Sequence, residues 1–151
     1  MGAKERLVEL GIELPPAPTP VASYVPVRVS GNLAFASGMV PLAEGLPIVT
    51  GRVGEDVSIE EGAQAARRCA LQALAALDEA VGLDRVQGIV KVTAFVVSAD
   101  GFTDQPKVAN GASDLFVEVF GESGKHARAA VSSPSLPLGV PVEIEAIAEL
   151  T

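Results

Sequence analysis

The residues best equipped for chemistry lie in the segment 124–131, GKHARAAV, and in the strand-like segment near the C-terminus. Arg128 stands between small apolar residues in a stretch that predicts a β-strand. A guanidinium in that setting either forms a buried structural ion pair or anchors a carboxylate ligand, because its planar fork matches a carboxylate. Glu143 could orient a water molecule or carry a proton. On the residues alone, the simpler interpretation of Glu143, Glu145 and Glu149 is a solvated strand face.

Other reactive side chains are scarce, and this scarcity excludes several kinds of site. The 151 residues include one His (His126), one Cys (Cys69) and one Tyr (Tyr24), and no Trp. A zinc site built from His and Cys normally takes three or four such ligands, and one Cys cannot form an intramolecular disulfide. The net charge of −8 and the shortage of aromatic residues argue against nucleic acid as a partner. No apolar run approaches a membrane span, so we expect a soluble cytoplasmic protein with no membrane partner.

The first 23 residues differ in pattern from those that follow. Residues 4–10 have helical spacing of apolar side chains, and Gly11 is placed to end that helix. Four prolines within 15–20 forbid regular structure, which predicts an extended arm. Alternation from Tyr24 onward, interrupted at 30–32, predicts a β-hairpin, with a third short strand at 48–53. We therefore expect an N-terminal helix and proline-rich arm at 1–23 and one domain at 24–151.

The rest of the chain alternates between helices and strands. Ser58 and Glu61 have the spacing of a capping box, which predicts a long helix whose alanine-rich stripe, with Cys69 as an apolar filler, packs on a sheet. A second helix is predicted at 107–120, and further strands at Val86–Val97, 127–131 and 140–150. This order predicts an α+β fold with two helices on one face of a mixed sheet. The uncovered face predicts a homo-oligomer with sites in the clefts between copies.

From Tyr24 to the C-terminus, the sequence resembles the RidA family of 2-iminobutanoate/2-iminopropanoate deaminases, also called the YjgF or L-PSP endoribonuclease family. The resemblance is carried by Tyr24, Ser37-Gly38, Asn110, Ala127-Arg128, Val131, Leu136-Pro137 and, above all, Val142-Glu143-Ile144-Glu145-Ala146-Ile147-Ala148. It implies a chorismate-mutase-like fold and a homotrimer with three active sites between subunits. It also implies hydrolysis of the enamines and imines that pyridoxal-phosphate enzymes release, giving 2-keto acids and ammonia without a cofactor.

The resemblance also assigns roles by position. Arg128 would hold the substrate carboxylate, and Glu143 would act on the attacking water. The backbone of Ala130 would supply hydrogen bonds to the substrate, which is a small carboxylate-bearing imine. The remaining pocket positions implied by the resemblance are Tyr24, Ser37, Gly38 and Asn110.

Three residues depart from the family pattern. Ala130 stands where many relatives have Cys, Ser113 where they often have an aromatic residue, and His126 where they often have Pro. Within a strand, the spacing of His126 and Arg128 places both on one face. We therefore expect a divergent subgroup with a reshaped pocket. Three functions stay open: an imine deaminase, a non-catalytic trimer that binds a small carboxylate metabolite, and a ribonuclease or translation inhibitor, against which the acidic charge counts.

Overall fold

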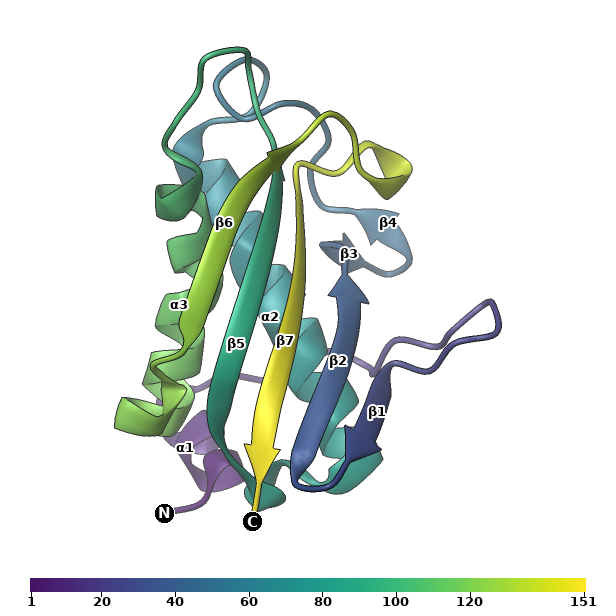
Figure 1. Cartoon of the computed structure of the whole chain (residues 1–151), viewed down its shortest axis with the longest axis vertical. Helices are drawn as coiled ribbons and strands as arrows, with labels where there is room; N and C mark the ends of the chain where they lie inside the picture. The colour runs from purple at the N-terminus through teal and green to yellow at the C-terminus, as the bar shows by residue number, and fades with distance from the viewer.

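A single five-stranded sheet organises the computed structural model, which describes residues 1–151 (Figure 1). The strands lie in the order β1-β2-β7-β5-β6, and within this sheet the β5–β6 pair is parallel while the other pairs are antiparallel. The predicted mixed sheet and α+β class are therefore confirmed. The strands of this sheet are β1 (Val27–Ser30), β2 (Leu33–Met39), β5 (Val86–Val97), β6 (Ala127–Ser133) and β7 (Val142–Leu150).

Two long helices cover one face of the sheet, as predicted (Figure 1). The first, α2 (Ile59–Val81), begins at the predicted capping box, where the Glu61 backbone N–H donates to Ser58 Oγ at 3.1 Å. The second is α3 (Gln105–Phe120), which begins two residues earlier than expected because Pro106 is tolerated in the first turn of a helix. The apolar sides of both helices and the inner side chains of the sheet form one hydrophobic core.

Helices α2 and α3 approach each other closely at Gly111. A Cβ added at Gly111 would collide with the carbonyl oxygen of Ala63 and lie 2.6 Å from its carbonyl carbon. Only glycine fits this crossing, because the opposing atoms are backbone and cannot rotate away. The contact fixes the position of the turn of α3 that carries Asn110 and Ser113.

A third, short helix packs beside α3. This helix, α1 (Ala3–Leu10), ends at Gly11, which has a φ of 67°. Ala3 and Leu7 are buried within the common core, and Arg6 Nε donates to the Glu118 carbonyl oxygen of α3 at 2.9 Å. The helix thus shares its core with the rest of the chain, while the division into 1–23 and 24–151 stays a prediction. None of the helices combines the length and the apolarity needed to cross a membrane.

The predicted strand at 48–53 is wrong. A small separate hairpin precedes it instead, formed by β3 (Leu42–Ala43) and β4 (Leu46–Pro47). Gly51 has a φ of 119°, which interrupts extended backbone. The Val53 N–H donates to the Val97 carbonyl oxygen at 2.9 Å, so Val53 forms only isolated bridges beyond the end of β5. The apolar residues that suggested a strand therefore belong to a loop, which packs on the hydrophobic core.

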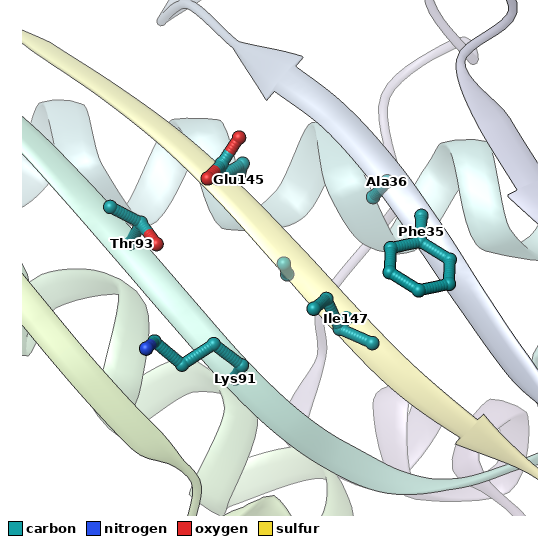
Figure 2. Close-up of a pocket in the computed structure, with 7 residues that line it drawn as sticks. Phe35, Ala36, Lys91, Thr93, Glu145 and Ile147 are labelled. Carbon is teal, nitrogen blue, oxygen red and sulfur yellow. The ribbon is translucent and has the colours of Figure 1, made fainter.

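The second face of the sheet carries no helix, and Figure 2 looks onto this face. Phe35 of β2, Lys91 and Thr93 of β5, and Glu145 and Ile147 of β7 line a hollow of about 150 Å³ there. The Phe35 side chain is 40% exposed. Apolar side chains on an uncovered face suit contact with another copy of the chain. The homo-oligomer nevertheless stays a prediction.

Candidate active site

Arg128 is held by two uncharged partners. It lies on β6 opposite Val92 of β5, which is buried on the face that the helices cover. Its Nη1 atom donates to Asn110 Oδ1 at 2.9 Å and to Ser113 Oγ at 3.1 Å, both on α3. The guanidinium forms no salt bridge within the chain. Its charge is therefore available to an anionic ligand, and the alternative of an intrachain ion pair does not apply.

His126 extends this cluster through Ser113. Its Nε2 atom lies 2.8 Å from Ser113 Oγ, and its Nδ1 atom lies 2.6 Å from the Gly124 carbonyl oxygen. The edge of the ring contacts Phe116, with ring centroids 5.9 Å apart. Burial lowers the pKa of His126, the hydrogen bond to Gly124 opposes that effect, and the charge of Arg128 lowers the pKa further. His126 and Arg128 therefore share one side, as the spacing predicted.

A cavity of about 220 Å³ opens beside these side chains. No carboxylate lines this cavity, whereas Lys125, His126 and Arg128 all do. Such a lining favours a ligand that carries negative charge. The remaining lining residues are Ser113 and Val117.

Glu143 lies with Gly38 at a different place in the fold. A Cβ added at Gly38 would lie 3.1 Å from the carboxyl carbon of Glu143 and 3.2 Å from Oε2, so Gly38 allows the carboxylate to sit against β2. Partial burial raises the pKa of Glu143, and the charge of Glu145 raises it further. A carboxyl group whose pKa lies closer to neutrality is better suited to exchange protons with a substrate.

Tyr24 and Ser37 lie near Gly38. Ser37 Oγ donates to the Val25 carbonyl oxygen at 2.6 Å, and the Ser37 N–H donates to the Pro26 carbonyl oxygen at 2.8 Å. These bonds tie the segment after the arm to the edge of β2. Tyr24, Ser37 and Gly38 line a cavity of about 420 Å³ together with residues of the proline-rich arm.

The seven predicted site residues thus fall into two groups within one chain. Arg128 pairs with Val92 and Glu143 with Phe95, and these partners are three residues apart on β5. Because side chains alternate along a strand, Arg128 and Glu143 project from opposite faces of the sheet. The first group is Arg128, Asn110 and Ala130, with Ala130 partly buried on β6 at the sheet edge; the second is Tyr24, Ser37, Gly38 and Glu143.

One lining residue of the larger cavity was missed by the sequence interpretation. Gln72 of α2 is 6% exposed, and its Oε1 atom accepts from the Leu42 N–H at 3.0 Å. The side-chain amide also carries two N–H groups, which can donate to a ligand in this cavity. The available signal was a single uncharged polar residue in the apolar run from Cys69 to Leu77. Cys69 itself is fully buried, which fits the filler role, and burial raises the pKa of its thiol well above the usual value.

The fold and these two groups define an α+β protein with a positively charged cluster, which contains no carboxylate, at one edge of its sheet. Residues 4–150 match the family described as "YjgF/chorismate_mutase-like, putative endoribonuclease". The chain belongs to this family, the RidA/YjgF family. The match begins within α1, so the helix that the sequence interpretation set apart lies inside the family match.

Individual relatives cover nearly the whole chain. Protein TCP17 of Trypanosoma cruzi is 46% identical over 146 residues, which are 95% of this chain and 91% of TCP17. The 2-iminobutanoate/2-iminopropanoate deaminase of Salmonella typhimurium is 36% identical over 132 residues, which are 87% of this chain and 91% of the deaminase. Atu1372 from Agrobacterium tumefaciens, a protein of unknown function, is 44% identical in sequence. Its crystal structure superposes on this chain with a TM-score of 0.90, over 99% of this chain and 92% of Atu1372.

Proposed function

We propose that this protein is a cytoplasmic homotrimer that hydrolyses reactive 2-imino acids and their enamines to 2-keto acids and ammonia. The observation that carries the proposal is the Arg128 guanidinium, which Asn110 and Ser113 orient but no carboxylate neutralises. Such a group suits the carboxylate that every 2-imino acid bears. The relative from Salmonella typhimurium that is named as a 2-iminobutanoate/2-iminopropanoate deaminase supports the same substrate class.

The proposed active site lies between two subunits. Arg128 lies on the edge strand β6, whereas Glu143 projects from the opposite face of the sheet beside Gly38. One chain therefore does not bring the anion anchor and the acid–base group together. A trimer in which β6 of one subunit meets the β2–β7 region of the next supplies both to one cleft.

The proposed chemistry needs only orientation and one proton carrier. Arg128 fixes the substrate carboxylate, and the Glu143 carboxylate accepts a proton from a water molecule as its oxygen adds to C2 of the imine. Glu143 returns that proton to the nitrogen, which gives a carbinolamine. Glu143 then accepts the proton of the new hydroxyl group and passes it to the nitrogen as the C2=O bond forms and the C2–N bond breaks, so that ammonia leaves and a 2-keto acid remains. Orientation of a reactive substrate can supply several kcal/mol of the barrier reduction, and one positioned proton carrier contributes roughly 10²–10⁴ in rate.

The test measures the initial rate of 2-keto acid formation from imines that an amino-acid oxidase generates in the assay. We expect the protein to accelerate this step and Arg128→Ala to reduce kcat/KM by roughly a hundredfold or more, because two hydrogen bonds from a charged donor are lost. Lys107→Ala removes one positive charge from α3 without touching the cluster, and serves as the control. Equal rates with and without the wild-type protein on short, branched and aromatic imines would contradict the proposal.

A second candidate is a trimer that binds a small carboxylate metabolite without turning it over. It is favoured by one observation: a single chain completes the anion cluster but does not place Glu143 beside it. Tight binding of a 2-keto acid with no acceleration on any imine would select this candidate. The ribonuclease hypothesis is opposed by the net charge of −8, since RNA binding relies on clustered positive charge.

A further inference from the structure

We propose that Ser113 and His126 are positioning residues that couple carboxylate binding at Arg128 to the uptake of one proton by the His126 ring. The inference rests on the anion-binding role proposed for Arg128 and adds a pH dependence to it. It also gives a function to two residues that contact each other beside Arg128. In physical terms, the site binds a carboxylate more tightly when the imidazole is protonated.

The hydrogen bonds around His126 have a fixed direction when its ring is neutral. The Gly124 carbonyl oxygen can only accept, so Nδ1 carries a hydrogen in either charge state of the ring. Arg128 can only donate, so Ser113 Oγ accepts from it. The neutral ring has its lone pair on Nε2, and Ser113 donates its single hydrogen to that atom. The Ser113 hydrogen is therefore occupied by His126 while the ring is neutral.

Protonation of the ring reverses one of these bonds. Nε2–H then donates to Ser113 Oγ, which has lone pairs for both His126 and Arg128. The Ser113 hydrogen is released, and a carboxylate on the Arg128 guanidinium is an available acceptor because the three side chains line one cavity. The ligand then gains a new O–H donor and a second positive charge nearby. Both changes favour the anion.

Burial, together with the charge of Arg128, favours the neutral form of the His126 ring near pH 7 when no ligand is present. Its hydrogen bonds involve no carboxylate, and both burial and Arg128 lower its pKa from 6.5. The acidic groups on adjacent elements are engaged or exposed: Glu118 pairs with Arg67 at 3.0 Å, Glu122 pairs with Lys125 at 2.8 Å, and Asp114 is exposed. The other charged groups on neighbouring strands are Arg128 on β6 and Lys91 on β5, which lies opposite Ala127.

The sign of the coupling follows from linkage. A bound anion raises the pKa of His126, and a proton on His126 raises the affinity for the anion by the same factor. The pKa of the free ring lies below 6.5 and that of the bound ring lies above it by the coupling. The affinity is therefore constant at about pH 8 and above, increases as the pH falls through these two pKa values, and levels off below the pKa of the free ring. A rise of about one pKa unit on binding corresponds to about a tenfold increase in affinity.

The experiment is isothermal titration calorimetry of the full-length protein with 2-oxobutanoate. This carboxylate is not an imine, so its binding is measured without turnover. Affinities are measured from about pH 8 to about pH 5, and the proton uptake is obtained from the dependence of the heat on the ionisation enthalpy of the buffer. We expect an affinity about tenfold higher at the acid end, with up to one proton taken up per site.

Three variants separate coupling from a structural role. His126→Gln keeps an acceptor for Ser113 but cannot titrate. We therefore expect this variant to bind 2-oxobutanoate at every pH with the affinity that the wild-type protein has near pH 8, and with no proton uptake. His126→Leu and Ser113→Ala remove the chain of bonds, and we expect about fivefold weaker binding, the effect of one hydrogen bond. A higher affinity of His126→Gln than of His126→Leu shows that the hydrogen bond to Ser113, and not only the packing of the ring, supports binding. Melting curves confirm that each variant is folded.

The outcomes also separate this inference from the proposed function. A pH-independent affinity in a wild-type protein whose binding is lost in Arg128→Ala overturns the coupling but leaves the anion anchor in place. Proton uptake that persists in His126→Gln assigns the proton to another group, such as Glu143, and also overturns the coupling. Failure of the wild-type protein to bind 2-oxobutanoate at any of these pH values contradicts the anchor itself.

Discussion

Substitution of Gly111 by alanine tests whether the crossing of α2 and α3 positions the anion cluster. The new Cβ would collide with the Ala63 carbonyl oxygen and lie 2.6 Å from the Ala63 carbonyl carbon. Carbon atoms pack at about 3.5–4.0 Å, so the two helices must separate by about 1 Å. This movement displaces Asn110 and Ser113, the two partners of Arg128.

The cost in stability can be estimated from two opposing effects. Overpacking against a rigid partner costs about 3 kcal/mol, and alanine in a helix interior recovers about 1 kcal/mol relative to glycine. The net loss of about 2 kcal/mol corresponds to a fall in Tm of roughly 4–8 °C for a chain of this length. Differential scanning calorimetry measures the fall, and titration with 2-oxobutanoate measures the accompanying loss of affinity.

The matched control is Asp114→Ala, which changes an exposed residue on the same helix. We expect its Tm to remain within about 2 °C of the wild-type value, because exposed substitutions usually change stability little. A Gly111→Ala protein with unchanged Tm and unchanged carboxylate affinity would refute the claim that this crossing sets the position of Asn110 and Ser113.

Three further predictions concern single side chains. Glu143→Gln lowers kcat by about a hundredfold. The activity of the wild-type protein should rise as the pH increases through the raised pKa of Glu143, and a pH–rate profile should show that this rise is absent in Glu143→Gln. Gly38→Ala displaces the Glu143 carboxylate by a few tenths of an ångström, so steady-state kinetics should show a lower kcat with a nearly unchanged KM. Asp78 accepts from the Leu83 N–H at 2.9 Å and pairs with Lys4 at 2.9 Å; burial raises its pKa, but these two partners outweigh burial and lower it overall. Its contribution to stability is therefore complete above about pH 4 and is lost as the pH falls through the lowered pKa, so the difference in Tm between the wild-type protein and Asp78→Asn should shrink in acid.

Much of the fold was predictable because its strongest signals are local. The capping box at Ser58 and Glu61 marks the start of α2 by the hydrogen bonds that two nearby residues can form. The strand Val86–Val97 was predicted with its observed bounds, since seven of its twelve residues, including both ends, are β-branched. The error at 48–53 arose because apolar residues in a loop packed on the core have the composition of a short strand, and only the backbone angle at Gly51 separates the two.

The arrangement of the site was less predictable because it depends on contacts between distant elements. The residues alone left Arg128 open between an ion pair and a carboxylate anchor, and the family resemblance predicted the anchor. The bonds of Arg128 to Asn110 and Ser113 require α3 to lie over β6, which no local pattern shows. The direction of Glu143 depends on register across β5, which no local pattern encodes. Residue spacing predicted the shared side of His126 and Arg128, whereas the Ser113 bridge between them became visible only in three dimensions.

The most direct test of the central claim, an active site assembled from two subunits, is complementation between two inactive variants. Arg128→Ala and Glu143→Gln are unfolded together in equal amounts, refolded and assayed for 2-keto acid formation. In randomly mixed trimers, about one quarter of the clefts combine an intact Arg128 with an intact Glu143 from the neighbouring subunit. We predict recovery of about a quarter of the activity of wild-type protein refolded in the same way. Mixed trimers that remain as inactive as either variant alone, while the refolded wild-type protein is active, would contradict the account.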